Sequence, residues 1–432
     1  MAKKGEIIGA VDLGSREVRV VIARQSSDGP IQIIGHGVAP SRGCVSQGVI
    51  QDLGAAQLAL KRALNTAERE AGVKVPKLFV GITGKSVKTT IRDGSVKLDK
   101  NVVEQRHLQE ALSMAESGIV APGTNPIHSI TSQEWYIDDM RVSEPLGIRG
   151  TVLKVRVHIA LLPTVIEDNI VSCIDSLGRE LEDLMFLPLA TGLGCLTLED
   201  MDLGVAVMDI GHNTTSVVVY RDRRVLDTRT FDWGGFLLTG DVAALLHVSY
   251  EEALDLILEY GVPQHRIERY GEEAEEDSPA KPATEAEERT KHIKLKSTVR
   301  DAPSIVDRSE LETIVFDRSE ELMTTVRQHL HAGGQARNLV RGVVLTGGTA
   351  LVPREKELAS AIFETPANIG LPDGFDSLPP AVNRPEYVGV LGVVRHGFEY
   401  RAAVRSGRIE PRRNIFSNAL RAVGGFIGRY FI

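Results

Sequence analysis

The sequence has few of the features that mark metal sites, disulfide frameworks or membrane spans. It contains only three cysteines, Cys44, Cys173 and Cys195, which stand far apart and form no CxxC pair. Histidine, aspartate and glutamate show no metal-ligand spacing either. We therefore expect neither a zinc site nor a disulfide framework, and the natural compartment is a reducing cytosol.

Long apolar runs are also lacking. No segment approaches the roughly 18 to 20 apolar residues of a spanning helix. Near the start, Glu6 and Asp12 interrupt the apolar run before it reaches the length of a signal peptide. We expect a protein that is neither exported nor integral to a membrane.

The charge of the chain is unevenly placed. The net charge is -8 over 432 residues, yet residues 401–432 carry seven arginines against one acid, Glu410. This asymmetry indicates a binding partner for the basic tail. At 42% hydrophobic residues, the rest of the chain is long enough to bury the cores of two to four subdomains.

Two stretches of the chain share one layout. Residues 7–35 and 204–230 each contain an apolar strand that ends in Asp-x-Gly, a tight polar turn, a second strand, a charged turn and a third strand. A helix is predicted after each unit, over 53–71 and over 250–260. Two copies about 200 residues apart predict two related α/β domains that face each other.

The remaining segments read as an insert, connecting elements and one polar loop. Residues 77–160 form a separate α/β insert, and residues 271–300 are charged and poor in large apolar residues, so we expect a disordered loop there, either with a partner or as a plain solvated insertion. Strands are predicted at 77–84, 86–94, 127–138, 152–162, 181–190 and 342–352, and helices at 104–118, 166–178 and 309–330.

Three glycine-bearing turns suit the binding of phosphates. Backbone N–H groups exposed in tight turns bind phosphate oxygens, and a nearby carboxylate holds magnesium through water. Each turn alone is equally well explained as a simple connection between strands, so only their joint order is specific. The turns contain Asp12, Gly14 and Ser15; Asp209, Gly211, Asn213 and Thr214; and Gly347 and Gly348.

This order of turns resembles the superfamily of actin, sugar kinases and large heat-shock chaperones. Within it, the stretches GHGVAPSRGCVSQGVIQDL, VGITGKSVKTT, LATGLGCLTLEDMDLGVAVMDIG and VVLTGGTALVPREKELA are similar to the FtsA family of bacterial cell-division proteins. The insert stands where that family carries its own subdomain. The resemblance implies an α/β, actin-like fold of two related domains around a nucleotide cleft, with ATP and magnesium as cofactors and Asp12 and Asp209 as indirect magnesium ligands.

The resemblance also implies domain boundaries. The first actin-like domain would take residues 1–76, completed by 161–202 and 381–400, with the inserted subdomain at 77–160. The core of the second domain would take 203–240, completed by 340–380, with its smaller lobe at 241–339. A basic linker at 401–413 and a membrane-targeting amphipathic helix at 414–432 would follow.

The second hairpin departs from the family pattern. Relatives carry Gly-Gly-Gly-Thr-x-Asp there, whereas residues 211–216 read GHNTTS. We expect Asn213 to keep the turn, because asparagine enters left-handed backbone conformations readily. The His212 side chain must point out of the cleft or fill it, and it is either a general base or an ordinary loop residue. We assign no catalytic residue and expect at most a weak ATPase.

In the helix after this hairpin, the family places an acid and a lysine near the ribose and adenine. Glu252 stands at the position of the acid, and Ile257 replaces the lysine. Leucine and isoleucine at this spacing are most simply residues that face the core. The resemblance and this departure together predict that any nucleotide binding is weaker or altered.

The last nineteen residues, NIFSNALRAVGGFIGRYFI, show helical periodicity. One face is apolar and aromatic, which suits either docking on the protein's own core or the interface of an anionic membrane. The basic linker before it favours the membrane, because each basic residue near an anionic surface contributes about 1 kcal/mol. The predicted membrane contacts are Phe416, Leu420, Arg421, Val423, Phe426, Ile427, Arg429, Tyr430 and Phe431.

The leading hypothesis from the resemblance is a membrane tether of the division ring. Its partners would be the tubulin-like protein FtsZ, bound around residues 241–333, further copies of the chain in an actin-like filament, anionic lipids and later division proteins, with no nucleic acid. It would lie on the cytoplasmic face of the cell membrane at the division septum. The alternatives are an actin-like scaffold of the type IV pilus kind and an ATP-dependent enzyme of the same fold, such as a sugar kinase.

Overall fold

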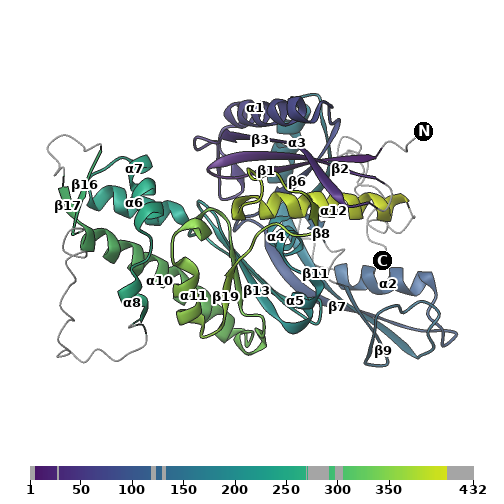
Figure 1. Cartoon of the computed structure of the whole chain (residues 1–432). Coiled ribbons are helices and arrows are strands. Elements are labelled where there is room, and N and C mark those ends of the chain that lie inside the picture. The colour runs from purple at the N-terminus through teal and green to yellow at the C-terminus, as the bar shows by residue number, and fades with distance from the viewer. Residues whose placement is uncertain are drawn as a thin grey trace.

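The computed structural model describes residues 5–26, 29–117, 123–128, 133–268, 270, 291–296 and 305–405. Within them, buried apolar side chains gather into three hydrophobic cores. Two of these cores lie beneath large mixed sheets, and the third belongs to an antiparallel sheet that projects from one end of the molecule (Figure 1).

The first large sheet has the strand order β12-β6-β1-β2-β3-β20. The three strands β1, β2 and β3 run antiparallel to one another. On the other side of β1, β6 and β12 extend the sheet in parallel, and β20 pairs in parallel with β3. The strands are β1 (Glu6–Leu13), β2 (Glu17–Gln25), β3 (Ile31–Pro40), β6 (Lys77–Ile82), β12 (Glu180–Phe186) and β20 (Phe375–Asp376). A short hairpin of β4 (Val45–Ser46) and β5 (Val49–Ile50) follows β3.

Helices cover both faces of the first sheet. On one face, α1 (Leu53–Ala71) packs on β2 and β3 and contacts α3 (Thr164–Asp175). On the other, α12 (Val388–Arg405) packs on β1, β2 and β6 and against α4 (Leu187–Cys195), which also contacts the second sheet (Figure 1). The helix α1 begins at the cap Asp52, whose side chain accepts from the Ala55 N–H, and ends at Gly72, as predicted.

The second large sheet repeats the plan of the first. Its order is β15-β14-β13-β18-β19, again with three antiparallel strands and two parallel ones. Asp12 and Asp209 stand at equivalent places, because each lies near the end of the strand that joins the antiparallel half to the parallel half. The predicted pair of related α/β domains is therefore confirmed. The strands are β13 (Val205–Ile210), β14 (Thr215–Arg221), β15 (Arg224–Phe231), β18 (Val343–Thr346) and β19 (Ala367–Ile369).

A helical lobe extends the second domain away from the first (Figure 1). The long helix α10 packs against α6, α7 and α11, and the two-stranded ribbon of β16 and β17 lies beside the start of α10. The elements are α6 (Gly235–Leu245), α7 (Tyr250–Tyr260), α8 (Gln264–Glu268), β16 (His292–Lys294), β17 (Ile305–Asp307), α10 (Arg308–Ala332) and α11 (Glu355–Phe363), with α5 (Leu198–Leu203) before β13.

The insert forms a sheet with the order β10-β9-β11-β7, and β8 pairs with β11. Its one helix within the described residues, α2 (Gln105–Glu116), packs on β7 and β11. Polar contacts tie this sheet to β15, including an Arg224 to Glu134 ion pair at 3.1 Å. The strands are β7 (Lys88–Lys97), β8 (Thr124–His128), β9 (Gln133–Ile137), β10 (Met140–Val142) and β11 (Val152–Pro163).

Five predictions of local structure were wrong or incomplete. The strand predicted at 342–352 ends at Thr346, and Gly348–Leu351 form a 3-10 helix. The strand predicted at 181–190 ends at Phe186, and the chain continues as α4. The single strand predicted at 127–138 is two strands, β8 and β9. A helix that was not predicted, α6, precedes the one predicted over 250–260. Residues 292–294 of the predicted 271–300 loop form β16, and most of the rest of that loop lies outside the described residues.

Candidate functional site

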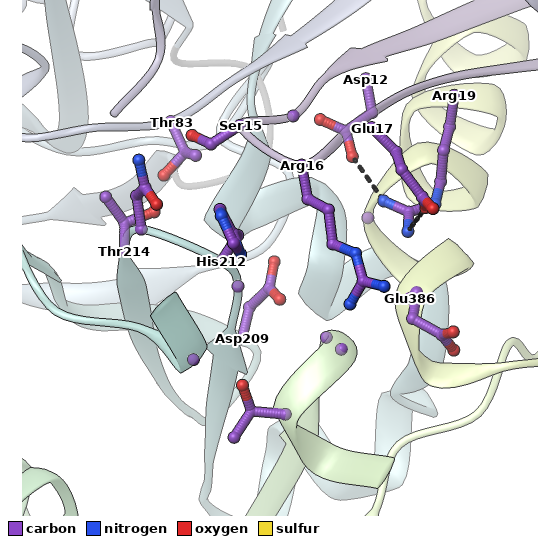
Figure 2. Close-up of a pocket in the computed structure, with 18 of the residues that line it drawn as sticks. Asp12, Ser15, Arg16, Glu17, Arg19, Thr83, Asp209, His212, Thr214 and Glu386 are labelled. Carbon is purple, nitrogen blue, oxygen red and sulfur yellow. Dashed lines mark hydrogen bonds and ion pairs between the residues drawn. The ribbon is translucent and has the colours of Figure 1, made fainter. Parts of the chain in front are cut away.

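A cavity of about 470 Å³ lies between the two large sheets, where the hairpins of β1 and β13 face each other (Figure 2). The structure brings together nine of the ten residues predicted as nucleotide contacts, all of which line this cavity. They are Asp12, Gly14, Ser15, Asp209, Gly211, Asn213, Thr214, Gly347 and Gly348.

The first hairpin presents a tight turn to the cavity. A Cβ atom at Gly14 would lie 2.6 Å from the Glu17 carbonyl oxygen, so the turn admits only glycine there. The Ser41 hydroxyl donates to the Gly14 carbonyl at 2.5 Å, and the Gln47 N–H donates to the Ser15 hydroxyl at 3.2 Å. The tip of this hairpin is thus held by the segment that follows β3.

The second hairpin is held by α6 and by the first domain. The Gly235 and Phe236 N–H groups at the start of α6 donate to the carbonyls of Gly211 and His212, at 2.9 and 2.7 Å. The Asn213 amide donates to the Ser46 hydroxyl at 3.0 Å, a contact that joins the two halves of the molecule. Asn213 has no positive φ, so the left-handed backbone that we expected for it is wrong, and hydrogen bonds keep the turn instead.

The His212 side chain lies at the edge of the cavity, against two aromatic rings. Its imidazole meets Phe236 edge-on at 5.2 Å between ring centroids and Tyr250 at 6.0 Å. Burial, helped by the positive charge of Arg16, lowers the pKa of His212 to about 4. His212 is therefore neutral at pH 7 and is too weak a base to activate water well.

The carboxyl groups of Asp12 and Asp209 form the acidic side of the cavity. Burial raises the pKa of Asp12 to about 6, against the opposing charge of Arg19 at 3.9 Å. Burial, and then the charge of Asp12, raises the pKa of Asp209 to about 6 as well. Two neighbouring carboxylates repel each other when both are ionised. A cation bound between them relieves this repulsion, so the pair favours cation binding.

This donor set fits magnesium held partly by water and phosphate. Magnesium takes oxygen ligands, keeps several waters and is commonly bound through one or two carboxylates together with substrate phosphates. The described part of the chain contains no cluster of three or more acidic, histidine or cysteine side chains arranged to hold a metal. Asp12 and Asp209 are thus chemically suited to an ion that arrives with a nucleotide, and the indirect magnesium site stays a prediction.

The turn after β18 closes a third side of the cavity with bare backbone. Gly347 has φ 84° and ψ -179°, a conformation that is essentially restricted to glycine. A Cβ atom there would lie 2.5 Å from an Asp209 carboxylate oxygen. A Cβ atom at the next residue, Gly348, would meet only the Glu386 side chain, at 4.0 Å.

The part of the cavity along α7 is apolar. Tyr250, Leu254 and Leu258 recur at steps of four, so they share one face of the helix, and Ile257 lies beside them. Glu252 is the predicted residue that does not line the cavity. Its carboxylate lies on another face of α7 and accepts a hydrogen bond from the Lys296 backbone N–H.

Several residues that line the cavity were not predicted from the sequence. Arg16, Glu17 and Arg19 belong to the first hairpin, Thr83 follows β6, and Glu386 precedes α12. Arg16 and Glu17 directly follow Ser15, which was predicted. Their place in the same turn was therefore enough to predict that they line the cavity. Thr83 and Glu386 carry no motif, because the tertiary fold alone brings them to the cavity.

The predicted membrane contacts all lie in residues 414–432, outside the described residues. Among the helices that are described, none combines the length and the apolar character needed to cross a membrane.

Two facing domains of this strand order, with Asp-x-Gly hairpins around a cleft, define an actin-like fold. Solved structures agree. A PilM-PilN type IV pilus biogenesis complex is similar with a TM-score of 0.60 and 16% identity, over 90% of this chain and 98% of that one. MreB5 of Spiroplasma citri bound to ADP is similar with a TM-score of 0.54 and 13% identity, over 93% of this chain and 98% of that one.

Sequence comparisons then give the family. The model of cell division protein FtsA matches residues 206–392, and that of the SHS2 domain inserted in FtsA matches residues 84–161. The FtsA of Pseudomonas aeruginosa is 27% identical over 92% of this chain and 90% of its own length. For Neisseria meningitidis the identity is 29%, over 91% of each chain. The chain belongs to the FtsA family of cell-division proteins.

Proposed function

We propose that this cell-division protein attaches filaments of FtsZ to the cytoplasmic face of the membrane at the division septum. The observation that carries the proposal is the family match, which includes the family's own inserted domain at residues 84–161. In this role the chain is a recruitment protein, and it also contacts later division proteins.

The arrangement of the ends supports a tether with two opposite attachment points. The helix α12 ends at Arg405, whose guanidinium pairs with Glu6 at 2.6 Å at the edge of the first domain. The helical lobe of α6, α7 and α10, where we place the FtsZ contact, lies at the other end of the molecule (Figure 1). An FtsZ filament bound there is held away from the surface that the tail binds.

We place the membrane contact in residues 414–432, because their apolar and aromatic residues recur at helical spacing. The eight residues between Arg405 and Asn414 can span at most about 30 Å when extended, so the body stays close to the membrane. A single amphipathic helix binds reversibly, and copies aligned in a filament bind more tightly through avidity. We therefore propose that actin-like self-association strengthens the attachment.

We further propose that the cavity holds a magnesium nucleotide, with ATP as the expected ligand. The bare turns at Gly14, Gly211 and Gly347 suit phosphates, and the carboxylates of Asp12 and Asp209 suit the ion. Because His212 is neutral, has a low pKa and packs against aromatic rings, it is a poor general base. We therefore expect hydrolysis of the nucleotide to be slow at most. The nucleotide in this proposal acts as a structural ligand that joins the two domains.

Co-sedimentation with anionic vesicles tests the tether. FtsZ should pellet with vesicles when the full chain is present and stay in the supernatant when residues 414–432 are deleted. Ile427→Glu, on the apolar face of the tail, should behave like the deletion, whereas Ser417→Glu, on the polar face, should retain most of the binding. The proposal fails if the truncated chain still pellets, or if the full chain pellets and FtsZ does not.

A further inference from the structure

Three arginines line the cavity, and two of them are held by carboxylates. Arg19 pairs with Glu17 at 2.6 Å and lies over the Tyr387 ring at 5.5 Å from its centroid. Arg384 pairs with Glu386 at 2.8 Å. Both guanidinium groups are thus fixed in place by groups of the cavity wall.

Arg16 differs from both. It is exposed, and among the described residues its guanidinium has no hydrogen-bond acceptor or carboxylate within bonding distance. Figure 2 shows its side chain extending from the tip of the first hairpin into the cavity, toward the side where Asp209 and Glu386 lie. A long cationic side chain with a free guanidinium is therefore available to a ligand at this place.

The two hairpin tips meet at one end of the cavity. The Gln47 N–H donates to the Ser15 hydroxyl of the first tip, and the neighbouring Ser46 hydroxyl accepts from Asn213 of the second tip. The apolar face of α7 that includes Leu254 and Leu258 lines another part of the cavity. A nucleotide places its base against apolar side chains and its phosphates against bare turns, so the terminal phosphate falls between the tips.

The charge across the tips is consistent with this placement. Burial and then the positive charge of Arg16 lower the pKa of His212, which stands on the second tip. Burial raises the pKa of Tyr250, and Arg16 opposes that shift. Arg16 therefore acts electrostatically on groups of the second domain, across the cavity from its own hairpin.

We propose that Arg16 binds the terminal phosphate of a nucleoside triphosphate and makes the cavity prefer a triphosphate over a diphosphate. This rests on the proposed binding of a magnesium nucleotide. A guanidinium matches two phosphate oxygens at once, and a magnesium ion at Asp12 and Asp209 occupies the acidic side. The diphosphate lacks the group that Arg16 reaches, so its affinity depends little on this residue.

Calorimetric titration of the full chain with magnesium and either ATP or ADP tests the proposal. Arg16→Gln should weaken ATP binding about tenfold to a hundredfold, the range for losing a hydrogen bond to a charged group, and ADP binding less than about threefold. Arg16→Lys keeps the positive charge but lacks the paired N–H donors of the guanidinium. Its affinity for ATP should therefore lie between those of the parent and of Arg16→Gln. Arg62→Gln, which removes an exposed arginine of α1 outside the cavity, is the matched control and should change neither value.

The ratio of the affinities for ATP and ADP decides whether the proposal for Arg16 holds. The proposal is overturned if Arg16→Gln leaves the ATP to ADP affinity ratio unchanged, whether it weakens both nucleotides equally or neither. It is also overturned if the unmodified chain binds neither nucleotide at millimolar concentration. Thermal unfolding of Arg16→Gln within about one degree of the parent shows that the fold is intact. The vesicle assay with FtsZ uses no added nucleotide, so it reports the tether independently.

Discussion

The two halves of the molecule share one sheet plan but hold their hairpins differently. The first tip is braced from its own half, by Ser41 and Gln47. The second tip is braced by α6 and, through Asn213, by the first half. The comparison teaches that the second turn, which carries His212 and Asn213, is held by partners outside its own hairpin and still lines the cavity.

The halves also differ in how they treat a buried acid. In the first, Glu68 of α1 pairs with Arg179 at 2.9 Å and accepts from the Val75 N–H. In the second, Glu355 of α11 is almost fully buried and accepts from the Ser319 hydroxyl at 3.0 Å, with no cation partner in the described residues. Burial raises the pKa of Glu355 to about 8. The first acid is thus buried with a cation partner, and the second is buried as a neutral group at pH 7.

The largest effect is expected where the Gly-Gly turn meets the second hairpin. Gly347→Ala places a Cβ against Asp209 in a backbone conformation that only glycine adopts readily, so it should lower the free energy of unfolding by about 3–5 kcal/mol. Gly348→Ala enters open space and should stay within about 0.5 kcal/mol. Urea unfolding measures both. Equal losses for the two variants would show that the turn is not packed on Asp209.

The buried acids should respond to substitution with opposite signs. The unfolded chain releases the Glu355 proton near 4.5 and the folded chain near 8, so between these pH values the folded state binds more protons and stability falls as the pH rises. Glu355→Gln removes this loss and should stabilise the protein at pH 9 by on the order of 2–4 kcal/mol.

Glu68→Gln is the counterpart in the first half. It breaks the pair with Arg179 and should destabilise the protein by roughly 2–4 kcal/mol. Denaturant unfolding at pH 5, 7 and 9 compares the two variants. If the free energy of unfolding of Glu355→Gln depends on pH as that of the parent does, Glu355 is not buried as a neutral acid.

The smallest effect is expected at His212. The His212 imidazole is neutral at pH 7 and packs against Phe236 and Tyr250. Replacing it should therefore change the affinity for the nucleotide only slightly. His212→Gly, which restores the glycine of the family pattern, should change the affinity for magnesium ATP by less than about threefold, or roughly 0.6 kcal/mol. Fluorescence titration at pH 7 measures this. A tenfold gain would mean that His212 obstructs the phosphate site.

The sequence predicted the duplicated plan because each half repeats a strand pattern and an Asp-x-Gly turn. It failed at α4 and α6, whose residues lack a clear polar face. α4 is buried on nearly all sides between the two sheets, and α6 exposes Phe236, Leu237 and Leu245 while burying Leu238 and Val242. Helical periodicity is visible only where one face is polar. The strands β16 and β17 were missed because each has only three residues, too few to show an alternation of apolar and polar residues.

The candidate site was predicted where a motif carried it and missed where only tertiary structure did. The three glycine turns were found, and nine of their residues line the cavity. Glu252 was placed by family pattern alone, although its helical spacing sets it apart from the face that Tyr250, Leu254 and Leu258 share. Thr83 reaches the cavity because β6 runs beside β1, and its hydroxyl lies 2.9 Å from that of Ser216 across the domains.

The most direct test of the central claim, that the cavity holds a magnesium nucleotide through both aspartates, is calorimetry of magnesium ATP binding in two buffers of different ionisation enthalpy. With both pKa values at about 6, each carboxyl group carries about half a proton at pH 6, and a bound cation expels it. We predict saturable binding that releases about one proton per nucleotide at pH 6 and almost none at pH 8, with the release reduced in Asp209→Asn. Binding without proton release at pH 6, or no binding at millimolar nucleotide, would contradict the account.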